Sequence, residues 1–321
     1  MPCLYYSKHS NIQTIKTPKL KGHIAILFAN IFFGINNPVM RSLTPDTLDP
    51  FVMTFFRVAG SAAIFWLISL FVKPEKIPLK DIGLLFLAAI LCHTTNQYPF
   101  IIGLSRTSSI DASIVVTLLP VLSMIFAAII IKEPITWKKA GGVFIGASGA
   151  LLLVLNEQNN NGRGSMQGNL IVLVGVLSFS LYLTVFKKLI SKYSVFSTMK
   201  WMFLFSAIQS EPFCHRALLA TDFASFDSSV WLRITYAVVC ATFVSYLLLV
   251  YAQKILRPTT LAMYNYVQPI MATLVAVIAG IDRLGMTELC SALLVFVGVY
   301  FVTQSKSRAQ IEAEKEKKSL P

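Results

Sequence analysis

Two long stretches of the chain repeat one pattern, 149 residues apart. The first runs from Ser108 to Leu153 and the second from Arg257 to Val302. In each, an apolar segment with an internal proline leads to an acidic residue, and a second apolar segment follows. Two long-period copies of one unit constrain the whole fold. In a membrane chain they indicate a transporter built from structural repeats.

The composition indicates a membrane chain. Of the 321 residues, 55% are hydrophobic and only 13% are charged, whereas a soluble domain carries about 25% charged residues. The net charge is +13, but the basic residues form no patch interleaved with aromatic residues. We therefore attribute the charge to cytoplasmic loops and expect a lipid bilayer, not nucleic acid, as the partner. The five cysteines are scattered and form no CxxC motif, so we expect no metal site and no cofactor.

Ten segments are apolar enough to cross a bilayer, which takes about 20 residues each. The predicted class is therefore all-α, a polytopic membrane protein with ten transmembrane helices. The segments are His23–Met40, Phe51–Val72, Ile82–Gly103, Ser109–Ile131, Ala140–Leu155, Asn169–Ile190, Val195–Gln209, Val230–Tyr251, Thr259–Ile281 and Met286–Thr303.

The basic residues predict the orientation. With the N-terminus inside, the inner segments hold about 20 Lys and Arg and the outer ones about 6, which predicts two cytoplasmic termini in a cell (inner) membrane. Five segments per repeat is an odd number, so the second repeat must be inverted relative to the first. The predicted organisation is a cytoplasmic segment at 1–22, a first five-helix repeat at 23–155, an external linker at 156–168, a second repeat at 169–304 and a cytoplasmic tail at 305–321.

Several motifs occur together in a specific order. They are the PV…KEPITW…GG…G…G run from the fourth segment into the fifth, FFGINNPVMR at Phe32–Arg41, Arg57, and YVQPI at Tyr266–Ile270. In this order the chain resembles the EamA-type branch of the drug/metabolite transporter (DMT) superfamily, over roughly Gly22 to Thr303. It departs from that pattern at Asp282-Arg283, where the second copy usually has Gly-Glu. The resemblance implies a secondary carrier of small metabolites such as amino acids, working by alternating access and exporting its substrate.

Polar side chains in the third segment share one helical face. His93, Asn96 and Gln97 are spaced i, i+3 and i+4. Such a stripe favours a substrate cavity, because unpaired polar groups are costly at membrane depth. The alternative is that these groups only hydrogen-bond to neighbouring helices. His93 also titrates near neutral pH in water, which leaves proton or ion coupling open.

The first segment offers a second candidate group. Asn36 and Asn37 lie just before Pro38, which removes the hydrogen bond to the carbonyl of Gly34. A freed carbonyl would serve as a ligand acceptor if the cavity reaches it, and the alternative is a packing groove around Gly34.

The ninth and sixth segments add further candidates for substrate binding and motion. Tyr264, Asn265 and Gln268 precede or adjoin Pro269, and Tyr182 offers an apolar ring with a polar tip. Pro269 corresponds to Pro120 in the first repeat, and paired prolines at equivalent places predict hinges.

Two cations lie inside apolar segments, Arg57 in the second and Lys200 in the seventh. They lie at similar depths in matching places of the inverted repeats, so we interpret both as gate candidates, with Asp111 as a partner for Arg57. The alternatives are snorkelling to the lipid headgroups for Lys200 and stabilisation by its own helix N-terminus for Asp111. Glu133 and the glycines Gly142, Gly146 and Gly149 are interpreted as structural, the glycines as a close helix-packing face.

An enzyme is not expected. The sequence has no GxxxxGK, HExxH or GxSxG motif. An intramembrane enzyme stays as a minor alternative, and a lipid-flipping or purely structural membrane subunit as another. The oligomeric state is open.

Overall fold

The computed structural model describes residues 10–44, 46–107, 109–156, 165–278, 286–306 and 310–311. These residues form helices and connecting loops without strands, which confirms the predicted all-α class. The helices of the first half are α1 (Ser10–Arg41), α2 (Pro50–Ser69), α3 (Leu79–Ala89), η1 (Ile90–Thr94), α4 (Thr95–Leu104), α5 (Ser109–Val116), α6 (Leu119–Ile130) and α7 (Trp137–Asn156). Those of the second half are α8 (Met166–Val185), α9 (Lys187–Lys192), α10 (Val195–Ala220), η2 (Phe223–Ser225), α11 (Ser228–Val238), η3 (Val239–Val244), α12 (Ser245–Ile255), α13 (Pro258–Met263), η4 (Tyr264–Tyr266), α14 (Val267–Ile278) and α15 (Met286–Thr303).

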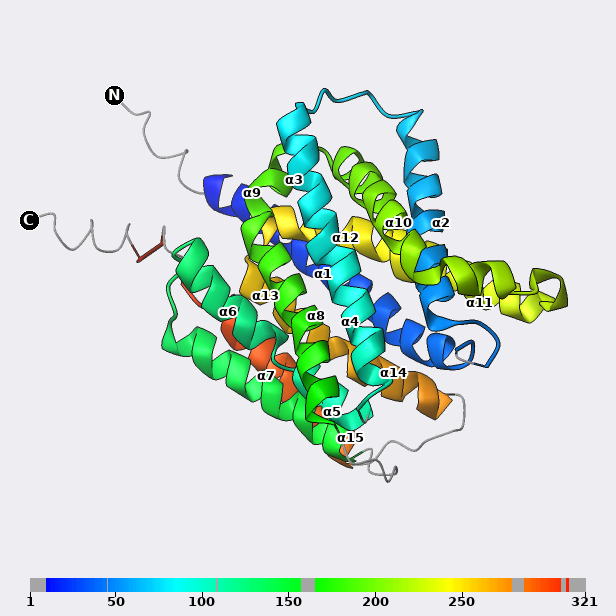
Figure 1. The fold of residues 1–321 in the computed structure, drawn as a ribbon. Coiled ribbons are helices and arrows are strands. Elements are labelled where there is room, and N and C mark those ends of the chain that lie inside the picture. Colours follow the sequence, from blue (N-terminus) through cyan, green and yellow to red (C-terminus); the bar gives the residue numbers. More distant parts are fainter. Residues whose placement is uncertain are drawn as a thin grey trace, which may run out of the picture.

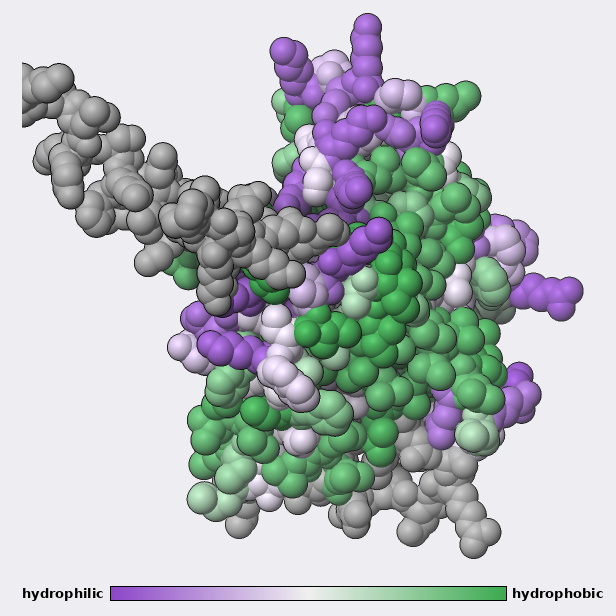
Figure 2. All heavy atoms as spheres, turned by 90° about the vertical axis from the view of Figure 1, so that its left-hand side faces the viewer, coloured by the Kyte–Doolittle hydropathy of each residue, from purple (hydrophilic) through white to green (hydrophobic). Residues whose placement is uncertain are grey.

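Helices lie at all ten predicted positions within the described residues. Five stretches are by themselves long and apolar enough to cross a membrane: Lys19–Met40, Pro50–Ser69, Leu79–Leu104, Met166–Val185 and Ser228–Ile255. The others are shorter, more polar, or broken into two pieces, as in α5 with α6 and α13 with α14. Figure 2 shows the matching surface, a broad hydrophobic area with hydrophilic residues gathered above it.

Three predicted boundaries were wrong. Helix α1 starts 13 residues before the predicted segment at His23, because hydropathy marks the apolar part of a helix and not its start. The sixth helix ends at Val185 rather than Ile190, and the short α9 follows. Helix α10 continues past Gln209 to Ala220, through an internal Pro212, since Ser210 and Cys214 on its polar stretch are buried.

Side-chain caps explain where several helices begin. Asp49 accepts hydrogen bonds from the backbone N–H groups of Phe51 and Val52 at the start of α2. Asp227 does the same for Val230 in α11, and Ser194 for Ser197 in α10. Each cap satisfies a backbone donor that has no partner inside its own helix.

One end of the bundle gathers the loops that were predicted to lie inside the cell. Lys192, the last residue of α9, forms an ion pair with Asp81 at the start of α3. The backbone N–H of Ser194 donates to Glu75, and Arg257 donates to the carbonyl of Ser305 after α15. The α2–α3, α9–α10 and α12–α13 connections and the end of α15 therefore lie at the same end (Figure 1).

The fifth and tenth helices pack closely through the predicted glycine face. A Cβ atom on Gly298 of α15 would lie 2.6 Å from the carbonyl oxygen of Gly142 in α7, and one on Gly142 would lie 2.7 Å from the carbonyl oxygen of Gly298. A Cβ on Gly149 would lie 2.8 Å from the carbonyl oxygen of Ser291. The interpretation of these glycines as structural is confirmed.

The two repeats are related by an internal two-fold axis. Two hydrogen bonds join residues that are 149 apart: Gln97 with Tyr246, and Tyr266 with the carbonyl of Thr117. A two-fold operation that exchanges residue i with residue i+149 brings such a pair together only at the axis. The offset seen in the sequence is therefore the symmetry operator of the fold, and the two five-helix repeats are inverted.

Candidate functional site

Six polar or aromatic side chains meet where the two repeats join, and we call them the central cluster. They come from the second, third, seventh and eighth transmembrane helices. Its members are Arg57, His93, Gln97, Ser206, Thr242 and Tyr246.

Arg57 is the charged member of the cluster. Its side chain is buried, and the residue lies about 10 Å from the start of α2. Nε donates to Thr242 Oγ1 at 2.9 Å, and Nη1 donates to Gln97 Oε1 at 3.4 Å. Gln97 in turn donates to the hydroxyl of Tyr246 at 3.4 Å. The guanidinium is therefore held by neutral groups of the opposite repeat and of α4.

His93 is fixed by a second hydrogen bond between the repeats. Its Nδ1 lies 2.9 Å from Ser206 Oγ, and the hydroxyl of Ser206 also lies 2.8 Å from the carbonyl of Met202. A hydroxyl has one hydrogen, so if it is donated to that carbonyl, Nδ1–H of His93 is the donor in the other bond. The imidazole packs against Phe203 and Tyr246, with ring centroids 4.6 and 4.7 Å away.

These two contacts are copies of one another. Adding 149 to Arg57 gives Ser206, and adding 149 to His93 gives Thr242. The Arg57–Thr242 and His93–Ser206 hydrogen bonds thus occupy equivalent places in the two halves. The repeats make the same contact with different chemistry, a cation in one and a hydroxyl in the other.

A π-helical turn delivers a residue of this contact in each repeat. η1 spans Ile90–Thr94 and contains His93, and η3 spans Val239–Val244 and contains Thr242. The starts of these turns are also 149 residues apart. π-helical turns are rare and occur often at functional sites, and here they appear twice at symmetric places inside otherwise α-helical spans.

The predicted stripe of the third segment is brought to the repeat interface. His93 and Gln97 join the central cluster, whereas Asn96 donates to the carbonyl of Gly175 in α8 at 3.1 Å. In this conformation all three side chains are hydrogen-bonded to neighbouring helices. Their role in substrate binding stays a prediction.

The other predicted binding residues form separate contacts. Gln268 bonds to Asn30 of α1 and to Asn265, each at 2.8 Å. The Tyr264 hydroxyl lies 3.0 Å from His23 Nδ1. Tyr182 is fully buried and donates to Gln253 of α12 at 3.1 Å. Only Gln97 and His93 of the predicted set lie in the central cluster.

The asparagines of α1 face different ways. Asn36 is buried, and its Oδ1 has no hydrogen-bond partner among the described residues. Asn37 is exposed on the bundle surface, so the structure does not place it with the other candidates. Helix α1 runs on through Pro38 to Arg41. A Cβ on Gly34 would lie 2.7 Å from the carbonyl oxygen of Gln268, which supports the packing-groove alternative.

The predicted gate residues are also separated. Lys200 lies with Nζ 5.0 Å from the ring centroid of Trp66, and it does not meet Arg57. Lys200 minus 149 is Phe51, so it is not the symmetry partner of Arg57. The side chain of Asp111 lies outside the part of the chain that the structure describes.

Pro120 and Pro269 each follow a break in their transmembrane helix. Pro120 is the second residue of α6, after a turn at Thr117 and Leu118. Pro269 is the third residue of α14, after the 3₁₀ turn η4. The breaks touch at the axis through the Tyr266–Thr117 bond of 2.7 Å. Their role as hinges stays a prediction.

A buried ion cluster joins the repeats at the end of the bundle that carries the predicted inner loops. We call this end the lysine-rich end. Lys139 donates to Glu133 Oε1 at 2.8 Å, and Arg257 of the second repeat lies 3.4 Å from the same oxygen. Glu133 Oε2 is buried without a partner among the described residues. Nearby, burial lowers the pKa of Lys187 in α9 to about 8. Glu133 was interpreted as structural, and the structure adds the partner from the second repeat.

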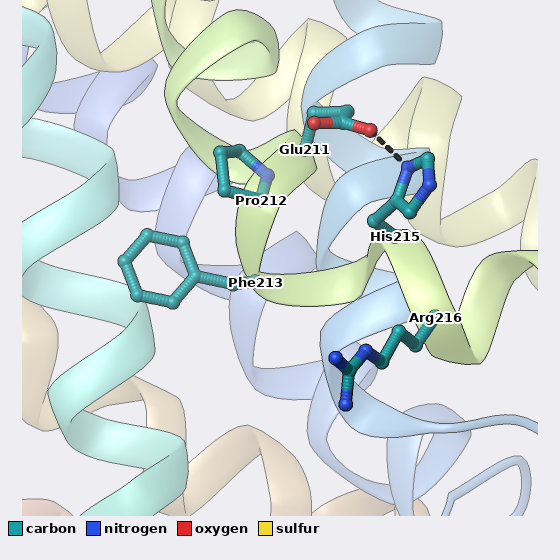
Figure 3. A pocket seen from close by; sticks show the side chains of 5 residues that line it. All are labelled: Glu211, Pro212, Phe213, His215 and Arg216. Atoms are coloured by element: carbon teal, nitrogen blue, oxygen red, sulfur yellow. Dashed lines mark hydrogen bonds and ion pairs between the residues drawn. The ribbon is translucent and has the colours of Figure 1, made fainter.

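The surface carries two pockets of note. One of about 450 Å³ lies along α10, where Glu211 and His215 form an exposed pair (Figure 3). Its lining residues all belong to α10 and include no member of the central cluster. The other, about 720 Å³, is an apolar groove between α1, α10 and α12, with Lys21 at one end and Phe32 and Leu247 in its wall. Among the described residues no group of His, Cys, Asp or Glu is arranged to hold a metal.

Inverted repeats that meet at a polar site between the two halves are a recurring architecture of membrane transporters. The profile of the EamA-like transporter family matches residues 20–155 and again 166–304. The chain belongs to this family. The EamA-type DMT resemblance found in the sequence is thereby confirmed, and the protein is a multi-pass membrane transporter.

EamA-like relatives span the same length. The transporter YcxC of Bacillus subtilis is 24% identical over 298 residues, covering 89% of this chain and 93% of its own. A transporter of Archaeoglobus fulgidus is 25% identical, covering 89% and 100%. Both are described as uncharacterized. The WAT1-related protein At3g53210 of Arabidopsis thaliana is 21% identical, covering 90% and 87%. A solved crystal structure shares the fold, with a TM-score of 0.71 and 18% identity, over 90% of this chain and 97% of the other.

Sequence reasoning missed Ser206, Thr242 and Tyr246 of the central cluster. Serine, threonine and tyrosine are common in transmembrane helices, so none stands out alone. The signal that finds them is the repeat offset, because adding 149 to Arg57, His93 and Gln97 gives these three residues.

Proposed function

We propose that this protein is a secondary carrier that moves small organic metabolites, such as amino acids, by alternating access, and that it works as an exporter. The observation that carries the proposal is the central cluster, which lies on the axis between the inverted repeats. In carriers of this design the substrate is held near the midplane at the repeat interface, and the repeats rock around it. Gln97, His93 and Arg57 would supply the polar contacts.

The orientation and organisation belong to the same proposal. The lysine-rich end carries the α2–α3, α6–α7, α9–α10 and α12–α13 connections, and it would face the cytoplasm of a cell (inner) membrane, with both termini. The repeats would extend over residues 23–155 and 169–304, with an external linker at 156–168.

The test begins with a thermal-shift screen of the detergent-purified protein against a metabolite library. A compound that binds only the folded state raises the melting temperature by mass action. Each hit is then tested by counterflow in proteoliposomes, with and without an imposed proton gradient. Saturable exchange of a hit supports a carrier, and dependence on the gradient shows coupling. If no compound both binds and exchanges, the proposal is wrong.

Lipid flipping is the second candidate, because the apolar groove between α1, α10 and α12 suits an acyl chain. The groove lies at the repeat interface. Its wall residues Phe32 and Leu247 are the sequence neighbours of Phe33 and Tyr246, and the rings of Phe33 and Tyr246 are 5.4 Å apart. Reconstitution with a fluorescent phospholipid discriminates the two functions. Movement of the phospholipid between leaflets without metabolite exchange favours flipping.

A further inference from the structure

The charge of Arg57 has no acidic counterpart among the side chains that the structure describes. The side chain is buried inside a transmembrane helix, and none of the acidic side chains that the structure describes lies within ion-pair distance of it. Its two protein partners, Thr242 and Gln97, are neutral. A cation at membrane depth normally pairs with an acid, a carbonyl or a ligand.

The Arg57 guanidinium also has N–H donors for which the described residues offer no acceptor. It carries five N–H groups. One bonds to Thr242, and a second makes the long contact of 3.4 Å with Gln97. Three remain without an acceptor in the described part of the chain. These donors lie in one plane, the arrangement that matches the two oxygens of a carboxylate.

The fold itself does not require a charge at this position. The symmetry partner of Arg57 is Ser206, which makes the equivalent contact to the π-helical turn of the other repeat through a neutral hydroxyl. A serine is thus sufficient to join the two helices. Burying the Arg57 cation costs free energy that burying the Ser206 hydroxyl does not. An interaction other than the contact between the two helices must therefore offset this cost.

We propose that Arg57 binds an anionic group, a carboxylate, of the transported solute. The inference rests on the proposed carrier function and names its substrate class. The carboxylate would accept from the free N–H groups of Arg57 in the central cluster, and the Tyr246 ring and Phe33 would border it with apolar surface. Because the second repeat offers Ser206 at the equivalent place, the site has one anion-binding side and one neutral side.

The test uses full-length protein and pairs of probes. Carboxylate metabolites are screened by thermal shift next to their primary amides, with sodium chloride as a separate arm. Acids that stabilise the protein are then titrated against Arg57→Gln and Arg57→Lys. Lys200→Gln is the matched control, because it removes a cation from a transmembrane helix outside the cluster. Each variant's melting temperature without ligand shows that it is folded, and Arg57→Lys keeps the test informative if Arg57→Gln does not fold.

We expect acids, but not their amides, to stabilise the parent. Hydrogen bonds to a charged group predict a loss of affinity of about 10- to 100-fold in Arg57→Gln. Arg57→Lys should lose less, and Lys200→Gln should bind like the parent. Equal shifts by acid and amide, or full acid affinity in Arg57→Gln, would overturn the inference. So would a chloride shift that depends on Arg57 without any carboxylate shift, since the ligand would then be an inorganic anion. Exchange of neutral solutes only would overturn it while leaving the carrier function standing.

Discussion

Lys139 and Glu133 show how a buried charge is tolerated at the end of a membrane helix. Lys139 is only 1% exposed, and its ammonium contacts both Glu133 and the carbonyl of Pro134. Arg257 brings a second cation from the other repeat. Through Arg257, Glu133 ties the α6–α7 connection to the start of α13, and we interpret this cluster as structural.

Replacing Lys139 by Met should strongly destabilise the protein. Without Lys139 the buried carboxylate of Glu133 keeps only the longer contact to Arg257, and breaking a buried pair costs about 3 kcal/mol or more. The double change Glu133→Gln with Lys139→Met should recover most of the loss, because the buried carboxylate is then gone and the partly exposed Arg257 still donates to the carbonyls of Val302 and Ser305. Melting temperatures of the three purified proteins test this. A double variant as unstable as Lys139→Met would show that packing, not charge, holds this corner.

At the residue scale, the sequence predicted which polar residues lie in the central cluster better than it predicted their hydrogen-bond partners. His93 and Gln97 were found because polar groups at membrane depth are costly, which makes them visible one by one. Arg57 was found for the same reason, and its observed contacts, Thr242 and Gln97, were not predicted. The side chain of its predicted partner Asp111 lies outside the described part of the chain. A partner on a distant helix depends on how the repeats meet, which hydropathy does not encode.

At the element scale, α7 and α15 approach each other closely through their backbones. The backbones approach so tightly that a Cβ on Gly298 would lie 2.6 Å from the carbonyl oxygen of Gly142 and from the backbone nitrogen of Gly146. Backbone atoms cannot move aside as a flexible side chain can, so the two helices would have to separate.

Gly298→Ala and Gly141→Ala form a matched pair of changes. The first should destabilise the protein by about 1–3 kcal/mol through overpacking. The second should be neutral or stabilise by about 0.5–1 kcal/mol, because nothing lies within 4 Å of its Cβ position and alanine is the better helix former. Both are read from melting temperature. A Gly298→Ala protein as stable as the parent would contradict the close contact.

The broken helices α5–α6 and α13–α14 are the elements most suited to bend. Pro120→Ala and Pro269→Ala each add an N–H to the first turn of α6 or α14, which should hydrogen-bond back across the break to the preceding helical turn and stiffen the span. We expect unchanged or higher stability with slower turnover, since gating often limits such rates. Melting temperature and counterflow on the same samples give both numbers. Lower stability with the parent's turnover per folded molecule would show that the prolines only set a static kink.

At the scale of the whole molecule, the internal repeat was the sequence feature that predicted most of the architecture. The odd number of segments in each repeat predicted the inversion, and the 149-residue shift relates η1 to η3 and the breaks before Pro120 and Pro269. Boundaries were predicted less well. Helix α10 passes through a polar stretch with Pro212, because burial against other helices outweighs local composition.

Orientation is tested with single cysteines at the two ends of the bundle. Gln167 and Lys188 are both exposed, before and after the apolar part of α8. In a background without the native cysteines, Gln167→Cys should react with an impermeant thiol reagent on intact cells, and Lys188→Cys only after lysis. The reverse pattern would place the lysine-rich end outside and contradict the positive-inside assignment.

The central claim is that the cluster on the two-fold axis holds the transported solute, and counterflow by Gln97→Ala tests it most directly. Gln97 links Arg57 to Tyr246, whereas Gln209 bonds to Thr94 outside the cluster and serves as the control. For a solute found in the thermal-shift screen, Gln97→Ala should lower exchange per folded molecule by about tenfold, the effect of roughly one hydrogen bond. Gln209→Ala should exchange at the parent's rate. Parental exchange by a folded Gln97→Ala protein would contradict the claim and leave the cluster as a contact that only joins the repeats.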